Sequence, residues 1–175
     1  EFLSDSDGVV AVDLAGAEAL FPTSDYEKLF AHARAEGIPF TIHAGEAAGP
    51  ESIRQAVDYG TARIGHGVNC IHDKNLMNII AEKGITLELC PTSNLNTKIV
   101  NDIKDYPIDK IINNKIKATI NTDNMTVSGT DEASEMKLIC DTFGYDGNMR
   151  RIFVNNAIDA AFLSDEMKEK LRGNL

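Results

Sequence analysis

One stretch of the sequence indicates the fold of this chain most directly: Pro39-Phe-Thr-Ile-His-Ala-Gly-Glu46. A short apolar run ends directly in His43, and Glu46 follows three residues later. Short apolar runs followed by polar residues are typical of strands in parallel β/α folds, which carry their chemistry at the carboxyl ends. The stretch therefore predicts a parallel strand that delivers a histidine and a glutamate to a site.

Four further apolar runs occur on either side of this strand. The centres of successive runs lie about 23 to 32 residues apart, the length of one strand-loop-helix-loop unit. The segments between them have helical periodicity, and three more helical segments follow the last run. The sequence thus predicts five β/α units with C-terminal helices, in one domain over residues 1–175. The other runs are Gly8–Val12, Arg63–Ile64, Ile85–Leu89 and Lys117–Ile120, and the closing helices are expected at 131–142, 148–162 and 164–172.

Composition excludes several classes of function. The net charge of −10 disfavours nucleic acid and anionic membrane surfaces as partners. No stretch is long and apolar enough for a membrane span, and the N-terminus lacks a signal-peptide pattern, so a cytoplasmic protein is expected. Cys70, Cys90 and Cys140 are too widely spaced for a cysteine zinc site and are expected as reduced core residues. With 175 residues the chain is about three units short of an eight-unit barrel, which needs about 250.

Ionisable side chains gather immediately after the apolar runs. Because the carboxyl ends of parallel strands meet on one face, these side chains are expected to form one site. Each has a structural alternative: His66 as a hydrogen-bonded core histidine, His43 with Glu46 as an exposed pair, and Asp13 and Asp123 as caps. Because such residues follow all five strands, a shared site is the favoured interpretation. His32 and His72 are not expected to belong to it, because neither follows a strand. The five strand ends are Asp13–Glu18, His43–Glu46, Gly65–Gly67, Cys90–Ser93 and Asn121–Asn124.

His43 and Asp123 offer one nitrogen and one hard oxygen, which suit zinc. Two ligands are too few for a catalytic zinc site, which usually has three protein ligands and a water molecule. No H-x-H, H-x-x-x-H or cysteine pair in this chain provides the rest. His66 could orient or deprotonate a metal-bound water, and Glu46 could act as a general acid if burial raised its pKa.

Taken together, these motifs resemble the adenosine deaminase family, zinc aminohydrolases built on a β/α barrel. The resemblance covers essentially the whole chain in order, which makes it far more specific than any single motif. The H-x-E and P-C-x-x-C signature of the deaminases that act on cytosine or on bases in nucleic acid is absent. The matching segments are Val9–Glu18, His43–Glu46, Arg63–Gly67, Cys90–Asn94 and Ile120–Asp123.

The resemblance implies a partial TIM-type (β/α)8 barrel comprising units four to eight. It implies zinc-dependent hydrolytic deamination of adenosine and 2'-deoxyadenosine to inosine and ammonia, as in purine salvage. His43 and Asp123 would bind zinc, Glu46 would protonate N1 of the purine, and His66 would position and deprotonate the zinc-bound water. The Gly16 backbone would contact the purine near N3.

Two departures from the family pattern affect these expectations. Asn124 stands where a second aspartate is usual, although its amide can still donate to purine N7. The H-x-H zinc pair and the first three strands are missing, so the chain alone is expected to be inactive and to need the other barrel half or self-association.

One alternative function is that of an adenine or other aminopurine deaminase. Gly65 argues against it, because an aspartate at this position is associated with adenine-type members. The other is a non-catalytic half-barrel that serves as an interaction module.

Overall fold

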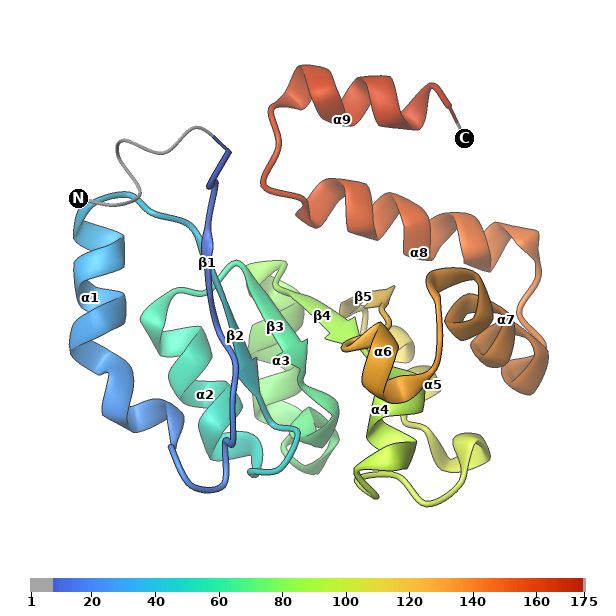
Figure 1. The fold of residues 1–175 in the computed structure, drawn as a ribbon, viewed down its shortest axis with the longest axis horizontal. Helices are drawn as coiled ribbons and strands as arrows, with labels where there is room; N and C mark the ends of the chain where they lie inside the picture. The colour runs from blue at the N-terminus through green and yellow to red at the C-terminus, as the bar shows by residue number, and fades with distance from the viewer. Residues whose placement is uncertain (1–7, 175) are drawn as a thin grey trace.

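The computed structural model describes residues 8–174, which form a five-stranded parallel sheet with helices around it (Figure 1). The strands lie in their sequence order, β1-β2-β3-β4-β5, and each pairs in parallel with its neighbour. This arrangement confirms the predicted α/β fold. The strands are β1 (Val12–Leu14), β2 (Phe40–Ala44), β3 (Arg63–His66), β4 (Thr86–Leu89) and β5 (Lys117–Ile120).

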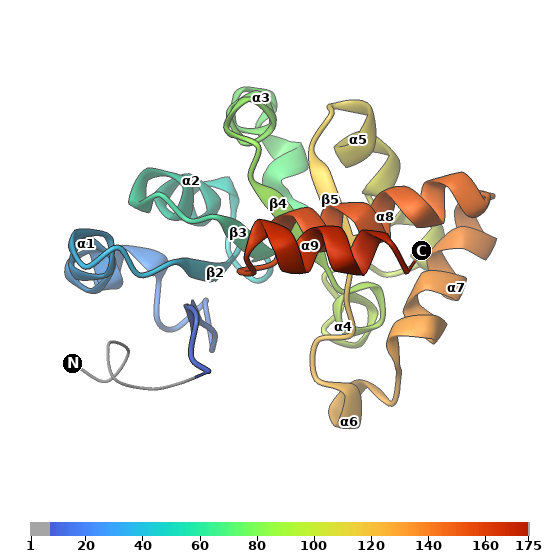
Figure 2. The ribbon, with the colours of Figure 1, turned by 90° about the horizontal axis from the view of Figure 1, so that it is seen from above.

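The helices lie on both sides of a curved sheet (Figure 2). α1, α2, α3 and α5 follow one another around its outside, whereas α4 and α6 lie on the other side, near the carboxyl ends of the strands. The α-helices are α1 (Glu27–Ala35), α2 (Pro50–Tyr59), α3 (Lys74–Lys83), α4 (Pro91–Asn96), α5 (Ile108–Asn113), α6 (Met125–Ser128), α7 (Glu132–Phe143), α8 (Gly147–Ala160) and α9 (Asp165–Arg172). Short 3-10 helices occupy Thr23–Tyr26, Val68–His72 and Ile103–Asp105.

The hydrophobic core lies between the sheet and its outer helices. Ile42, Ile64 and Leu87, from the three central strands, are fully buried, because a parallel sheet covered by helices excludes water. The helices contribute further fully buried side chains on the face that the helical spacing in the sequence predicts. These include Phe30, Ile53, Leu76, Ile80, Ile108 and Ile111.

Most helix boundaries follow signals in the sequence. Pro50 begins α2 at a first-turn position, where its missing N–H costs nothing. Gly84 ends α3 with φ +67°, a left-handed conformation that suits glycine. The three closing helices α7, α8 and α9 occur where they were predicted, with small shifts at their ends.

Two parts of the prediction were wrong or incomplete. The first strand was expected at Gly8–Val12 but occupies Val12–Leu14, because pairing with β2 begins only where the Val12 N–H donates to the Pro39 carbonyl. The apolar run before it is partly exposed, with Val9 and Val10 at the surface. Helices α4 and α6 were not predicted, because these short segments, PTSNLN and MTVS, contain no row of apolar residues at helical spacing.

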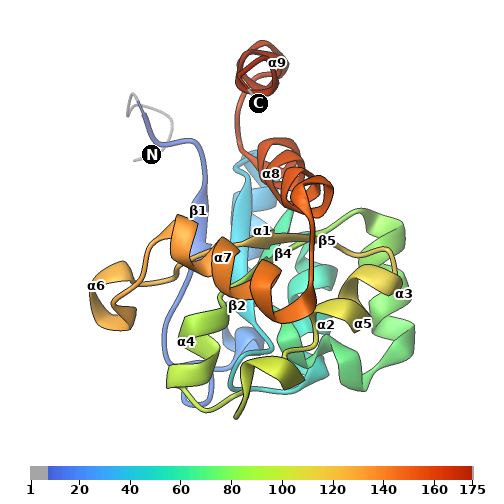
Figure 3. The same ribbon diagram turned by 90° about the vertical axis from the view of Figure 1, so that its right-hand side faces the viewer.

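Helices α8 and α9 lie one above the other near the amino ends of the strands (Figure 3). Arg63 of β3 connects this layer to the sheet: its guanidinium donates to the Ala160 carbonyl at 3.2 Å and lies 4.1 Å from the centre of the Phe162 ring. The same guanidinium forms an ion pair with Glu88 of β4. Nowhere in residues 8–174 is there a helix with the length and apolar character that a membrane crossing demands.

Candidate active site

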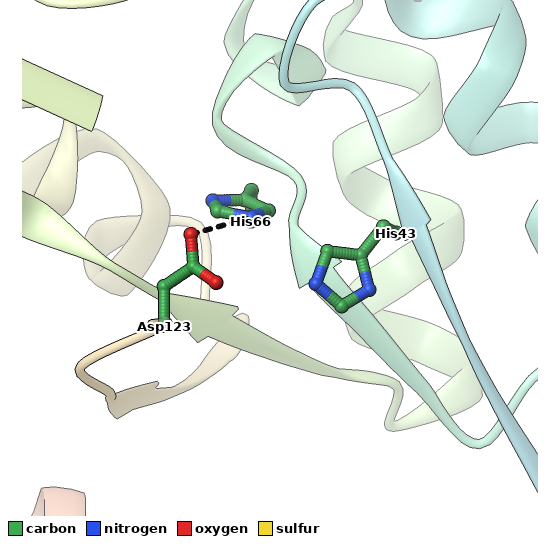
Figure 4. Close-up of side chains that lie close together, drawn as sticks. All are labelled: His43, His66 and Asp123. Carbon is green, nitrogen blue, oxygen red and sulfur yellow. Dashed lines mark ion pairs between the residues drawn. The ribbon is translucent and has the colours of Figure 1, made fainter. Parts of the chain in front are cut away.

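His43, His66 and Asp123 come together at the carboxyl end of the sheet (Figure 4). One nitrogen or oxygen atom from each lies within 4.8 Å of the others, a spacing that suits a shared ion or a small reacting group. His43 is on β2 and His66 ends β3, and the sheet register places them beside each other, with His43 opposite Gly65 and Ala44 opposite His66. Asp123 follows β5. The strand ends therefore converge as the sequence predicts.

The backbone is strained at two of these three residues. His66 has φ +59° and Asp123 has φ +56°, in the left-handed region that residues other than glycine seldom occupy. Such conformations persist where the surrounding structure enforces them, and they cluster at functional sites. At His66 the enforcing contact is the chain reversal into Gly67, whose N–H donates to the Ala44 carbonyl.

His43 is oriented by a carboxylate on the neighbouring strand. Its Nδ1 lies 3.2 Å from Oδ1 of Asp13 in β1, and this hydrogen bond is the main cause that raises the pKa of His43. With Nδ1–H donated to Asp13, the lone pair of the neutral ring is on Nε2. A histidine held by a carboxylate in this way is a common metal ligand. Asp13 therefore orients His43 from the neighbouring strand.

Glu46 faces His66 across the site. Its Oε2 lies 3.7 Å from His66 Nε2, while its Oε1 accepts from the Asn94 amide at 3.2 Å and the Thr97 hydroxyl at 3.4 Å. His66 is almost completely buried, and burial lowers its pKa because water no longer stabilises the charged ring. The carboxylate of Asp123 lies 4.0 Å from His66 Nε2 and accepts a hydrogen bond from the Ser93 hydroxyl at 2.7 Å.

Glu18 holds the loop that presents Glu46. Its carboxylate accepts hydrogen bonds from four consecutive backbone N–H groups, of residues 45–48, at 2.6 to 3.1 Å. It also accepts from the hydroxyl of Ser52 in α2 at 2.5 Å. Sequence reasoning placed Glu18 at a strand end but gave it no role. Only its position after β1 hinted at the site.

His43 lines two cavities. One of about 270 Å³ is lined by Gly16, Glu18 and Phe21, among others, and one of about 260 Å³ by Gly65, Glu88 and Asp123. Gly16 and His43 thus line the same cavity.

Asn124 serves as the N-cap of α6, where its Oδ1 accepts from the Val127 N–H at 3.0 Å. The cap uses the oxygen of the amide and not its nitrogen donors. Asn124 is exposed and does not line either cavity beside His43. The structure thus brings His43, His66, Asp123 and Glu46 together and places Asn124 outside the two cavities.

The donor set fits a divalent transition metal. His43 Nε2 and the Asp123 carboxylate are ligands that zinc accepts, and the Asp13 hydrogen bond supplies the orienting contact such a histidine usually has. Within residues 8–174, His43, His66 and Asp123 form the only group of three or more potential metal ligands.

The sequence matches one family of known proteins over nearly its whole length. A sequence model of the family described as adenosine deaminase matches residues 2–175. Curated adenosine deaminases from Haemophilus ducreyi and Clostridium perfringens are 46% and 41% identical to the chain, over 96% and 94% of its length. One from Escherichia coli is 43% identical over 98%. The chain spans about half the length of these relatives, namely 49%, 50% and 52%.

Solved structures share the fold. An amidohydrolase from Burkholderia ambifaria with bound zinc superposes with a TM-score of 0.89 at 25% identity, over 97% of this chain and 48% of its own. An N6-methyl-AMP deaminase from Arabidopsis thaliana gives a TM-score of 0.85 at 29% identity, over 94% of this chain and 48% of its own. The described strands and helices therefore correspond to part of a TIM-type barrel.

Proposed function

The chain belongs to the adenosine deaminase family, and on that premise we propose that it forms the C-terminal part of a zinc-dependent enzyme that hydrolyses adenosine and 2'-deoxyadenosine to inosine and ammonia. Residues 1–175 would supply units four to eight of one barrel domain. The observation that carries the proposal is the convergence of His43, His66, Glu46 and Asp123 at the carboxyl end of the sheet. Such an enzyme would act in purine salvage in the cytoplasm.

The zinc site is proposed at His43 and Asp123. Zinc bound there would supply a Lewis acid that lowers the pKa of the attacking water. Two ligands from this chain leave room for ligands from the other part of the barrel, and the zinc-containing relative from Burkholderia ambifaria makes zinc the first metal to test. The alternative cap role of Asp123 has less support, because the residue that caps α6 is Asn124.

Glu46 is the proposed proton donor to N1 of the purine. Because Oε1 already accepts from Asn94 and Thr97, the acidic hydrogen must sit on Oε2. That oxygen lies 3.7 Å from His66 Nε2. Protonation of N1 makes C6 more electrophilic toward water. Addition of the water oxygen to C6 and cleavage of the bond from C6 to the amino group would then give inosine and ammonia.

Gly16 and Asn124 are the proposed purine contacts. The Gly16 backbone lines the cavity beside His43, where no side chain blocks approach to the ring near N3. The Asn124 amide nitrogen would donate to N7, since its cap contact uses the oxygen.

The test of the acid role replaces Glu46 by glutamine in the complete enzyme that contains these residues. Glu46→Gln should lower turnover about 10²-fold or more, because the amide cannot donate the proton, and zinc content should stay near normal. Glu82→Gln, an exposed substitution in α3, is the matched control and should change neither. Near-normal turnover of Glu46→Gln would exclude the acid role.

A companion variant, His43→Ala, tests the metal assignment by metal analysis of the purified enzyme. Loss of the ring nitrogen should reduce bound zinc well below one ion per subunit. Unchanged zinc occupancy would show that the ligand assignment is wrong.

Adenine or another aminopurine is the second candidate substrate. Gly65 bears on this choice, because a Cβ atom there would lie 2.8 Å from Cγ and Nδ1 of His43, so any side chain would displace the ring. An aspartate associated with adenine-type members could not be placed here without moving His43. The complete enzyme should therefore show a higher kcat/KM with adenosine than with adenine, and the reverse order would favour the second candidate.

A further inference from the structure

Asn94 of α4 connects the two acid-base groups of the site. It is completely buried, and its side chain makes three polar contacts. Its Oδ1 accepts from the Tyr106 hydroxyl at 2.9 Å, and its Nδ2 donates to Glu46 Oε1 at 3.2 Å and lies 3.1 Å from His66 Nδ1. Tyr106 is also buried, at 2% exposure, so its hydroxyl needs this partner.

The orientation of the Asn94 amide follows from its neighbours. An ionised Glu46 can only accept a hydrogen bond, so the nitrogen and not the oxygen of the amide must face it. The Tyr106 hydroxyl donates to the opposite side and stabilises the same orientation. The amide nitrogen carries two hydrogens, and the second points to His66 Nδ1.

This orientation determines the tautomer of His66. Because the amide nitrogen only donates, Nδ1 of His66 must accept, and the hydrogen of the neutral ring is on Nε2. His43 has the opposite tautomer, because it donates Nδ1–H to Asp13 and has its lone pair on Nε2. Of the two neighbouring histidines, only His43 therefore has an unprotonated nitrogen, Nε2, that can bind a metal in the site.

We propose that Asn94, held in place by Tyr106, is a positioning residue that keeps His66 in the Nε2–H tautomer. His66 is then a hydrogen-bond donor beside the reacting group; it is neither a metal ligand nor the base that the family resemblance implies for deprotonation of the zinc-bound water. Its effect on turnover depends on the proposed deaminase function, but the tautomer does not. The donor nitrogen lies 3.7 Å from Glu46 and 4.0 Å from Asp123, so it would stabilise negative charge that develops between them.

The direct test is ¹H–¹⁵N spectroscopy of the complete enzyme labelled with ¹⁵N-histidine, at pH 8 and without metal, with His66 assigned from a His66→Gln variant. The two neutral tautomers have distinct cross-peak patterns. Wild type should show the hydrogen on Nε2, and Asn94→Asp, whose carboxylate accepts from Nδ1–H, should move it to Nδ1. A wild-type Nδ1–H tautomer, or no change in Asn94→Asp, would overturn the proposal.

Kinetics give the second readout, with a variant that removes one hydroxyl. Tyr106→Phe should lower kcat about tenfold with KM within about twofold, because the Asn94 amide loses the hydrogen bond that orients it while the proposed substrate contacts are unchanged. Asn94→Asp should lower kcat about 10²-fold. Tyr145→Phe loses a comparable hydroxyl contact, to Asp109, away from the site and should leave kcat unchanged.

The outcomes separate this proposal from the proposed function. If wild type fails to deaminate adenosine but shows the Nε2–H tautomer that Asn94→Asp reverses, the function is wrong and the assignment of the tautomer stands. If wild type is active and Tyr106→Phe retains full kcat, the positioning role is overturned and the function stands.

Discussion

Asp13 illustrates how one carboxylate defines what a neighbouring side chain can do. In the sequence it follows an apolar run and could cap a turn, but in the fold it accepts the Nδ1 hydrogen of His43 from the adjacent strand. The hydrogen bond fixes the tautomer and the direction of the ring, so that Nε2 faces Asp123 and His66. The geometry of the proposed metal site thus depends on a residue that would not bind the metal itself.

Asp13→Ala in the complete enzyme should weaken zinc binding about 10- to 100-fold, the usual cost of removing a partner that orients a metal-bound histidine. Competition with a chromophoric chelator measures the affinity. Asp58→Ala, an exposed change in α2, is the control and should bind zinc like wild type. If both variants bind zinc equally well, Asp13 has no part in the metal site.

Cys70 shows the effect of burial on reactivity. Burial raises the pKa of its thiol to about 12, because the thiolate would be cut off from water. At pH 8 about 10⁻⁴ of the group is then ionised, and only the thiolate reacts. Iodoacetamide should leave Cys70 unmodified in the native enzyme and alkylate it after unfolding, as followed by peptide mass mapping. Rapid native alkylation would contradict its place in the core.

Helix α4 connects strand β4 to the site, and a buried glutamate from another helix holds it. It carries Ser93 and Asn94, which contact Asp123, Glu46 and His66. The start of this helix is fixed by the fully buried Glu135 of α7, whose carboxylate accepts from the Thr92 N–H at 3.0 Å and the Thr130 hydroxyl at 2.6 Å. Packing of α7 therefore influences the site through α4.

Glu135→Gln should destabilise the enzyme by about 1–3 kcal/mol, because an amide replaces one of two buried acceptor oxygens by a donor. Denaturant unfolding of the complete enzyme measures this change. Glu132→Gln, in the same first turn but exposed, is the matched control and should cost less than about 0.5 kcal/mol. Equal free energies of unfolding for the two variants would mean that the buried hydrogen bonds of Glu135 make no net contribution to stability.

The molecule as a whole has two open sheet edges, at β1 and β5 among the described residues. Unpaired strand edges favour association with further strands, and a closed barrel removes both edges. The relatives that the chain matches are about twice its length, which fits a sheet that is completed by other strands.

The isolated 175-residue chain should therefore self-associate, and it should bind zinc weakly because it offers two proposed ligands. Light scattering coupled to size-exclusion chromatography should give a mass above 19.1 kDa. A monomer that unfolds cooperatively would instead favour the non-catalytic half-barrel as an interaction module.

The sequence by itself determined the order of the strands, most of the helices and the four side chains that meet at the site. These features depend on local patterns: apolar runs, helical spacing, and polar residues directly after each strand. The contacts of Asp13, Glu18 and Asn94 were decided by the tertiary structure alone. Their partners lie 12 to 48 residues away in the chain, and strand register and helix packing, which local patterns do not encode, bring them within hydrogen-bond distance.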